Sequence, residues 1–358
     1  MTRGFGIVGT GVIAAIHAEA IALIPDARLV AVTDVAAGSA SAFAAARGCA
    51  AEPDLGALLT RGDVEVVCVC VPSGLHARVG VAAAKAGKHL VVEKPIDVSL
   101  DAADRLIEAA RAAAVTLTVI SQHRFDAGLV ELRALLSAGA LGRLVLGEAS
   151  TKWYRGQAYY DSAAWRGTRA MDGGSLMNQG IHYVDLLRWC MGPVAEVTAV
   201  CTTQAHRIES EDTALAIVRF GSGAVGTILS STAAFPGFPQ RLEITGTEGT
   251  VTVEDGQIVR RAFRAGEPAA AAVSGGGVPA AAVPGSGVPA APASPAAAGS
   301  DPVALDIASH AAQIADLLAA AGSGREPAVS GQSAREALEI VCAVYESSRT
   351  GRPVILDR

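Results

Sequence analysis

The sequence lacks the features that mark membrane proteins and nucleic-acid-binding proteins. No apolar stretch approaches the roughly 20 residues that a transmembrane helix needs. The net charge of −6 provides no basic surface for nucleic acid or anionic lipid. Glycines at positions 4, 6, 9 and 11 interrupt the apolar run after Arg3, which fits a strand entering a glycine turn better than a secretion signal. We therefore expect a cytoplasmic protein that binds neither nucleic acid nor membranes.

Cysteines are few, and they are not arranged as metal ligands or redox pairs. The six cysteines stand at positions 49, 68, 70, 190, 201 and 342, without CxxC spacing. Cys68 and Cys70 share one face of an apolar strand, so we interpret the cysteines as reduced thiols of the core. Charged residues are also scarce, at 18% against 51% hydrophobic residues. A globular chain of 358 residues is long enough for two domains.

The first 122 residues predict a Rossmann domain with a parallel sheet. Apolar runs that read as buried strands alternate with Ala-rich stretches that read as helices. Helices on both faces of such a sheet are the usual arrangement. The predicted strands are 4–9, 29–34, 64–71, 89–93 and 116–120, and the predicted helices are 12–24, 38–47, 75–87 and 99–113.

Residues 123–358 predict a second α/β domain, whose sheet is open and mostly antiparallel. A helix at 126–138 is followed by longer alternating strands, separated by turn signals. Residues 265–300 are low in complexity and repeat "GVPAA", so we expect a disordered loop without a catalytic role. The remaining predicted strands are 143–154, 194–205, 211–220, 223–233, 240–246, 249–254 and 354–356, and the last helices are 303–321 and 332–349.

A GxGxxA motif predicts a dinucleotide site. It runs from Gly9 to Ala14, directly after a predicted strand and at the start of a predicted helix. Such glycines permit a tight turn and a close approach of the backbone to a pyrophosphate, which the helix N-terminus attracts. Asp34 ends the next strand, where a carboxylate accepts hydrogen bonds from a ribose and repels a 2′-phosphate. No Arg or Lys follows closely, so NAD is favoured over NADP.

Three further segments complete a family resemblance. Glu93-Lys94-Pro95 ends a buried strand, "VPSGLHA" covers residues 71–77, and "GGSLMNQGIHYVDLLRW" covers residues 173–189. With the glycine motif, they resemble the Gfo/Idh/MocA family of NAD(P)-dependent oxidoreductases, from residue 3 to the tail "SSRTGRPVIL" and omitting 265–300. The resemblance implies a Rossmann domain, a larger domain with an open sheet, a substrate cleft between them and a homodimer or homotetramer.

The resemblance also implies the residues of the site. In the family, the Lys of the EKP motif and the His of the segment matching 173–189 lie by the reacting carbon. The corresponding residues here are Lys94 and His182. Asn178 stands where Asp is commoner; an amide cannot exchange a proton at neutral pH, but it can orient His182 or bind a hydroxyl. The cofactor-binding residues predicted from the motifs and the resemblance are Gly9, Thr10, Gly11, Val12, Ile13, Asp34, Val71, Pro72, Ser73, His76, Glu93, Lys94 and Gln122.

Helical spacing predicts that the polar residues of 173–189 form one seam. At about 100° per residue, His182, Asp185 and Trp189 fall within about 40° of Asn178. A helix that is apolar elsewhere and has one polar seam is buried except where the seam faces a cavity. One alternative is a core histidine satisfied by Asp185. A metal site is disfavoured, because Asn is a poor ligand and no second His is near.

The segment 151–174 predicts the substrate-binding residues. It contains five of the eight Trp and Tyr residues, interleaved with Arg, Gln and Asp. Aromatic faces and directional polar groups suit a sugar or cyclitol, and arginines suit a carboxylate or diphosphate. Some of these rings are expected to pack the domain junction instead. The candidates are Lys94, Lys152, Tyr154, Arg155, Trp165, Arg166, Asn178 and His182.

Together these features predict an NAD-dependent dehydrogenase of a sugar, sugar derivative or cyclitol. When an alcohol is oxidised, its proton must leave as the hydride leaves carbon. His182 has a suitable ordinary pKa for that exchange, and Lys94 can polarise the oxygen or share the proton. Two alternatives are an NAD-dependent redox-neutral glycosidase of the same fold and a non-enzymatic NAD-binding sensor.

Overall fold

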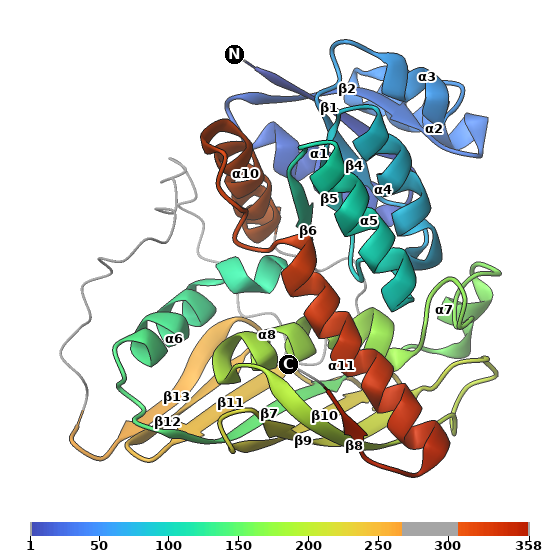
Figure 1. Ribbon diagram of the computed structural model, residues 1–358. Coiled ribbons are helices and arrows are strands. Elements are labelled where there is room, and N and C mark those ends of the chain that lie inside the picture. The colour runs from blue at the N-terminus through green and yellow to red at the C-terminus, as the bar shows by residue number, and fades with distance from the viewer. Residues whose placement is uncertain (1, 267–306, 357–358) are drawn as a thin grey trace. The chain divides into compact units, whose positions relative to one another are not determined.

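The computed structural model describes residues 2–266 and 307–356, which fall into two compact units (Figure 1). The first unit comprises Met1–Gln122 and Leu305–Leu338, and the second comprises His123–Ala304 and Glu339–Arg358. Most of the low-complexity segment 265–300 lies outside the described residues. In the part of the chain that is described, no helix is long and apolar enough to cross a membrane.

The first unit contains a parallel sheet of six strands, as the alternating pattern predicts. The strand order is β3-β2-β1-β4-β5-β6, with β1 between β2 and β4. Its buried apolar strands form the core of this unit together with the helices. The elements are β1 (Arg3–Val8), α1 (Val12–Ala22), β2 (Ala27–Thr33), α2 (Ala37–Arg47), β3 (Ala50–Ala51), α3 (Leu55–Thr60), β4 (Val66–Val69), α4 (His76–Lys85), β5 (His89–Val92), α5 (Leu100–Ala112) and β6 (Leu117–Val119).

Two short elements of this unit were not predicted. Strand β3 has only two residues and helix α3 only six, so neither is long enough to show a hydrophobic period. Helix α3 does carry a local signal, because the carboxylate of Asp54 accepts a hydrogen bond from the backbone N–H of Ala57 at 2.8 Å. Aspartate is a favoured residue at this capping position.

The chain returns to the first unit near its C-terminus, whereas the sequence placed residues 123–358 in the second domain. Helix α10 (Ile307–Ser323) buries Ile314 and Leu317 in the core of the first unit. The side chain of Gln313 accepts a hydrogen bond from Ser121 N at 2.9 Å and donates one to Val119 O at 2.8 Å. Helix α11 (Gly331–Thr350) then runs from the first unit into the second.

The second unit contains a mostly antiparallel sheet of eight strands in the order β13-β12-β11-β7-β10-β9-β8-β14. Within it, β7 and β10 pair in parallel. Helices α6 and α8 lie on one face of this sheet (Figure 1). The elements are α6 (Ala127–Ser137), β7 (Leu144–Lys152), α7 (Gln157–Asp161), α8 (Ile181–Met191), β8 (Val194–Thr202), β9 (Thr213–Phe220), β10 (Val225–Ser231), β11 (Arg241–Gly246), β12 (Gly249–Glu254), β13 (Gln257–Phe263) and β14 (Val354–Ile355).

Strand β13 was also not predicted, because this edge strand is largely exposed and shows no apolar alternation. The sequence does contain a hairpin signal before it, at Asp255-Gly256. Both residues have positive φ, at 42° and 77°, as a tight hairpin turn requires. An Asp-Gly pair after an alternating strand therefore indicated the hairpin where the apolar pattern did not.

The helix expected at 173–189 differs from a regular α-helix. Residues Ser175–Gly180 form a π-helical turn, and the α-helical part α8 begins at Ile181. In a π-helix the backbone hydrogen bonds join residues five apart, so the chain advances by a smaller angle per residue. The predicted seam therefore does not continue unchanged from Asn178 to His182, since the 100° spacing applies only from Ile181 onward.

Candidate functional site

The cofactor residues predicted in the first unit come together at the carboxyl edge of its parallel sheet. Strand pairing places Val8 beside Thr33 and Val69, and Val69 beside Val92. The chain leaves these strands at Gly9, Asp34, Cys70 and Glu93, so the glycine turn, the acidic residue and the two motif segments start in one row. Ligands of open α/β sheets bind at this edge.

The glycine turn has the geometry that a dinucleotide phosphate requires. Gly9 has a φ of 90°, and a Cβ there would lie 2.4 Å from the carbonyl oxygen of Cys70. A Cβ on Gly11 would meet no described atom within 4 Å, which leaves space beside the first turn of α1. No side chain of the described residues caps α1, so its N-terminal N–H groups suit a phosphate. The turn therefore fits the pyrophosphate of NAD.

Asp34 is fixed against the glycine turn. Its Oδ2 accepts hydrogen bonds from the backbone N of Thr10 at 2.7 Å and from Thr10 Oγ1 at 2.9 Å. Its Oδ1 accepts one from Ala36 N at 2.9 Å. This carboxylate orders the turn and still has acceptor capacity for a ribose hydroxyl. It also carries the negative charge that disfavours a 2′-phosphate.

The segment 71–77 is connected to the EKP motif through His76. The two ring nitrogens of His76 lie 2.6 Å from Pro95 O and 2.9 Å from Val71 O. His76 is only 1% exposed, and burial lowers the pKa of its ring. The structure thus gives His76 a role in joining two backbone segments. Ser73 and Gln122 are also buried, whereas Val71, Pro72 and Lys94 are half-buried.

A buried ion pair lies directly before Lys94. Glu93 Oε1 is 2.8 Å from His17 Nε2, and Glu93 Oε2 accepts a hydrogen bond from Lys94 N at 3.1 Å. Burial opposes the charge of Glu93, but the hydrogen bond and charge of His17 outweigh it and lower its pKa to about 2. The backbone position of Lys94 is therefore held by a carboxylate that stays ionised.

His17 lies in a buried cluster with Glu93, Cys68, Cys70 and His310. Burial opposes its charge, yet Cys70, Cys68 and Glu93 together raise the pKa of its imidazole well above the ordinary value. Burial also raises the pKa of Cys70 to about 11, so this group is a neutral thiol at pH 7. The ionised partner of His17 at neutral pH is consequently Glu93. His310 stacks edge-on against His17, with ring centroids 5.9 Å apart.

In the second unit, His182 is the first polar side chain of α8. It is 7% exposed, and its ring packs edge-on against His123 with centroids 5.1 Å apart. His123 Nδ1 lies 2.7 Å from the Asp126 carboxylate. The residues around His182 therefore include a second histidine that is itself oriented by an acid. Sequence reasoning missed His123, because 59 positions separate it from His182 and neither residue shares a motif with the other.

Asn178 is oriented by Asp172. Its Nδ2 donates a hydrogen bond to Asp172 Oδ1, and Asp172 Oδ2 accepts a second one from Gly167 N at 2.6 Å. Asp172 does not cap the turn that follows it, because the turn begins after Gly174 and its first N–H groups are bound by other residues. The Oδ1 of this amide accepts a hydrogen bond from Gln179 Nε2 at 3.3 Å, and an amide oxygen can also accept from a hydroxyl.

Asp185, which the alternative of a core histidine assigned to His182, forms an ion pair with Arg124. Its two carboxylate oxygens accept hydrogen bonds from Arg124, one of them from Nε at 2.7 Å. Both side chains are 5% exposed. Arg124 and Arg133 also lie over the ring of Trp189, each 5.4 Å from its centroid. The end of the predicted seam thus forms an ion pair with Arg124, before α6, and a cation–π contact with Arg133, within α6.

Arg155 and Arg166 meet at Tyr159, a residue that the sequence did not single out. Their guanidinium carbons lie 5.6 and 4.2 Å from its ring centroid, and Arg166 also lies 4.6 Å from the ring of Trp165. The Tyr159 hydroxyl accepts a hydrogen bond from Gln179 Nε2 at 3.4 Å. Two predicted substrate residues are therefore linked, through Tyr159 and Gln179, to the turn that carries Asn178.

Lys152 and Tyr154 lie in a different environment. The ammonium of Lys152 is 5.1 Å from the ring centroid of Phe238, and Tyr154 packs edge-on against Phe235 with ring centroids 5.2 Å apart. Phe235 is 74% exposed and Phe238 is 43% exposed. These two candidates thus belong to an aromatic surface, and the structure does not bring them to the Tyr159 group.

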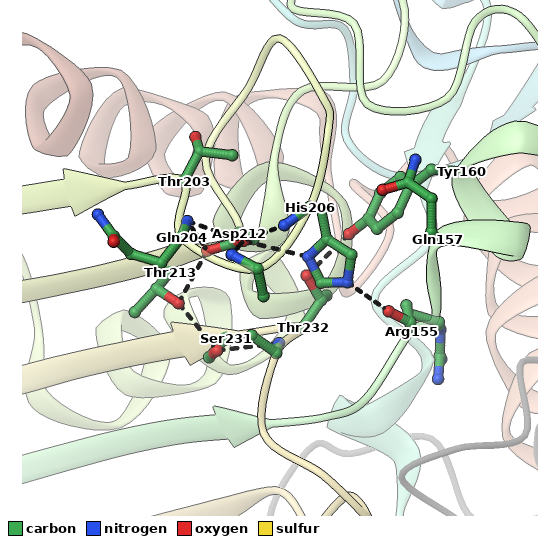
Figure 2. A network of polar contacts seen from close by, with 12 residues as sticks. Arg155, Gln157, Tyr160, Thr203, Gln204, His206, Asp212, Thr213, Ser231 and Thr232 are labelled. Carbon is green, nitrogen blue, oxygen red and sulfur yellow. Dashed lines mark hydrogen bonds and ion pairs between the residues drawn. The ribbon is translucent and has the colours of Figure 1, made fainter.

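A buried polar network supports the backbone of Arg155 (Figure 2). Asp212 is fully buried and accepts hydrogen bonds from Ala205 N at 2.7 Å and from Gln204 N at 3.1 Å. Burial opposes its charge, but these bonds and the contact with His206 outweigh it and lower its pKa. His206 Nε2 in turn lies 2.6 Å from Arg155 O. The loop before β9 is therefore tied to the segment that carries Arg155.

The described residues provide no cluster of three His, Cys, Asp or Glu side chains that could hold a metal ion. The fold and the glycine turn instead define an NAD-binding oxidoreductase of the Rossmann type. Residues 3–121 match the model of the oxidoreductase family with an NAD-binding Rossmann fold, and residues 129–252 match the GFO/IDH/MocA C-terminal domain. The chain belongs to the Gfo/Idh/MocA family.

Named relatives agree with this assignment. The chain is 31% identical to the myo-inositol 2-dehydrogenase of Thermotoga maritima over 70% of this chain and 75% of that protein. It is 29% identical to an inositol 2-dehydrogenase of Rhizobium meliloti over 71% and 76% of the two chains. The WlbA dehydrogenase of Bordetella pertussis, solved with NADH and UDP-GlcNAcA, covers 100% of both chains with a TM-score of 0.84 and 31% identity. The predicted fold, family, oxidoreductase class and NAD cofactor are thereby confirmed.

Proposed function

We propose that this protein transfers a hydride between NAD and a carbinol or keto carbon of a sugar derivative, with a sugar acid or sugar nucleotide favoured over a neutral cyclitol. The observation that carries the substrate preference is the pair of guanidinium groups at Tyr159, next to the turn that carries Asn178. Guanidinium groups bind carboxylate and phosphate oxygens through two hydrogen bonds at once. The WlbA relative, solved with a nucleotide-linked sugar acid, supports this choice, whereas the inositol dehydrogenases support a cyclitol.

In this proposal, bound NAD supplies the hydride acceptor or donor, and the protein handles the proton of the alcohol. His182 is the leading general acid and base, because an imidazole exchanges protons readily near neutral pH. Lys94 polarises the substrate oxygen or shares the proton, and Asn178 binds a hydroxyl or orients the substrate. Lys94 belongs to the first unit and His182 to the second.

The first experiment follows NADH formation with a panel of inositols, uronic acids and UDP-linked sugar acids, using NAD and NADP separately. We expect turnover with NAD and with an anionic sugar. Turnover of an inositol alone would overturn the substrate preference. Turnover of a glycoside without net NADH would indicate a redox-neutral glycosidase, and NAD binding without any turnover would indicate a sensor.

The second experiment tests the catalytic residue. His182→Ala should reduce kcat by at least about 10²-fold, as expected for loss of a general acid–base, while the Kd for NAD stays within about twofold. His89 begins β5, at the other end of that strand from Lys94, so His89→Ala provides a matched control. Normal turnover of the His182 variant would contradict the assignment.

The third experiment tests the arginines. Arg166→Ala should raise the KM for an anionic sugar by about tenfold, which corresponds to the loss of one charge-assisted hydrogen bond of roughly 1.5 kcal/mol. The same variant should leave the KM for a neutral polyol nearly unchanged. Arg241→Ala is a suitable control, because Arg241 is exposed on β11 and pairs with Glu243. An equal effect on both substrates would argue against recognition of an anion.

We also propose a homodimer or homotetramer that associates through the face of the second sheet that α6 and α8 do not contact. This face presents Val200, Leu215, Ile217 and Val225 on adjacent strands, at 61, 49, 64 and 43% exposure. Apolar side chains gathered in this way are typical of an interface between subunits. Sedimentation of the wild-type chain and of Ile217→Arg tests it: the variant should dissociate.

A cytoplasmic location is part of the same proposal. None of the six cysteines, all of which lie in the described part of the chain, forms a disulfide, as expected in a reducing compartment. Localisation of a fluorescently tagged chain would test it.

A further inference from the structure

The turn that carries Asn178 begins without a capping side chain of its own. The residue before it is Gly174, and the first three residues of the turn are Ser175, Leu176 and Met177. The first N–H groups of any helix have no partner within the helix, and an unsatisfied buried donor costs about 1–3 kcal/mol. Something outside the turn must therefore bind these groups.

Glu211 and Tyr345 bind all three of them. The N–H of Ser175 donates to the backbone oxygen of Glu211 at 2.9 Å, and the N–H of Leu176 donates to Glu211 Oε1 at 2.8 Å. The N–H of Met177 donates to the hydroxyl of Tyr345 at 3.3 Å. That hydroxyl donates in turn to Glu211 Oε1 at 3.0 Å. The backbone oxygen and carboxyl group of Glu211, together with the phenol of Tyr345, thus replace the usual capping residue.

The fit of this arrangement is tight. Glu211 is 7% exposed, and a Cβ on Gly174 would lie 1.7 Å from its Oε2. Only a glycine leaves room for the carboxyl group at this point. The next N–H, that of Asn178, bonds to Gly174 O at 3.0 Å, so the intrahelical bonds begin where the external ones end.

We propose that Glu211 and Tyr345 are positioning residues, which fix the turn 175–180 and thereby set Asn178 and His182 for reaction. The inference rests on the proposed function, because it assigns the reaction to those two residues. Glu211 acts through the backbone of the turn and does not touch the reacting atoms. A carboxylate also suits this place because a helix N-terminus favours negative charge.

The test compares Glu211→Ala with Glu211→Gln. The amide of Gln can still accept from Leu176 N–H, whereas Ala removes the acceptor. We expect Glu211→Ala to lower kcat at least tenfold with an unchanged Kd for NAD, and Glu211→Gln to restore kcat to within about threefold. Glu209 lies on the same loop but is exposed, so Glu209→Ala is the matched control. Equal losses in the two Glu211 variants, or no loss in either, would overturn the inference.

Amide hydrogen exchange provides a second measurement that does not depend on turnover. In Glu211→Ala the amide of Leu176, which loses its acceptor, should exchange at least tenfold faster than in Glu211→Gln. Should the Ala variant fail to fold, Tyr345→Phe serves in its place and should speed exchange at Met177 selectively. If wild type shows no turnover, faster exchange would still support the cap while the proposed function failed. If amide exchange in the turn is unchanged in both Glu211→Ala and Tyr345→Phe, the inferred cap is wrong, whether or not the enzyme turns over a substrate.

Discussion

Glu93 in the first unit and Glu211 in the second are both buried glutamates beside a predicted catalytic segment, yet their charges are controlled in opposite ways. Glu93 contacts His17, and its pKa falls from 4.5 to about 2. Glu211 is bound by neutral donors, from Leu176 N–H and Tyr345 O–H, and burial raises its pKa to about 7. The Glu93 carboxyl is therefore ionised at neutral pH, whereas the Glu211 carboxyl titrates near pH 7.

The difference shows that burial alone does not decide the charge of a carboxyl group. Desolvation is the largest single effect on both residues and disfavours the charged form in both. A neighbouring cation reverses the outcome at Glu93, because an opposite charge at hydrogen-bond distance stabilises the anion. The neutral N–H and O–H donors at Glu211 stabilise its anion less than desolvation destabilises it, so its pKa stays raised. The four predictions below test this contrast, in order of decreasing effect.

Removal of His17 should have the largest effect. His17→Ala leaves the Glu93 carboxylate buried without its ion-pair partner, and breaking such a pair costs about 3–5 kcal/mol of unfolding free energy. Urea denaturation at pH 7 measures it. The double variant His17→Ala/Glu93→Gln should recover part of the loss, since it removes the stranded charge. A cost below about 1 kcal/mol for His17→Ala would contradict a charged pair.

Replacement of Glu211 by Gln, which keeps an acceptor for Leu176 N–H, should stabilise the fold, but only at higher pH. The pKa is about 7 in the folded state against 4.5 for an ordinary glutamate. The folded chain therefore binds more protons between these values, and stability falls as the pH rises through that window. Glu211→Gln should be about 1–3 kcal/mol more stable than wild type at pH 8.

The advantage of Glu211→Gln should fall below about 1 kcal/mol at pH 5, where the folded wild type is already protonated. Thermal or urea unfolding at the two pH values gives the comparison. Glu209→Gln should show no such dependence on pH, because Glu209 is exposed. A Glu211 variant that is less stable than wild type at pH 8 would mean that the ionised carboxyl is well solvated.

The close fit of Gly174 against Glu211 predicts a cost of about 1–3 kcal/mol for Gly174→Ala, from overpacking. Adding Glu211→Ala should relieve part of this cost, because the clash would be gone. Gly38→Ala is the matched control: a Cβ there meets no described atom within 4 Å in helix α2, so it should stabilise by about 0.4–1 kcal/mol. Equal unfolding free energies of the two glycine variants would argue against the tight fit.

The smallest effect is expected at Cys70. Its thiol is neutral at pH 7, so Cys70→Ala should cost about 1 kcal/mol through lost packing and leave the pair of His17 and Glu93 intact. Denaturation at pH 6 and pH 8 should give the same cost. A loss as large as that of His17→Ala would identify a thiolate, and not Glu93, as the anion beside His17.

Much of the first unit could be predicted because its signals are local. The glycine turn, the strand that ends at Asp34 and the EKP segment each lie within a few residues, and strand periodicity places them at one edge of a sheet. The features that the sequence did not predict depend on contacts between distant residues. The pairing of Asp185 with Arg124 and the cap formed by Glu211 and Tyr345 join positions 61 and 134 apart.

The helix at 173–189 illustrates the same limit. Its burial and polar content could be predicted from composition, but its π-helical turn could not, since the 3.6-residue period assumes regular hydrogen bonds throughout. Tyr159 shows an intermediate case. It lies inside the aromatic segment that predicted the substrate residues, yet only the fold distinguishes it from Tyr154, five residues earlier, which packs against Phe235.

The return of the chain to the first unit has a consequence for its synthesis. Ser121 and Val119 at the end of the parallel sheet acquire their hydrogen-bond partner, Gln313, only after almost two hundred further residues have been translated. At roughly 5–20 residues per second, that delay lasts on the order of 10–40 s. During that delay, the apolar side chains of α1 that later join Ile314 and Leu317 of α10 in one core cluster lack this partner. The NAD-binding unit of this enzyme is thus begun before the second unit and completed only after most of the second unit has been made.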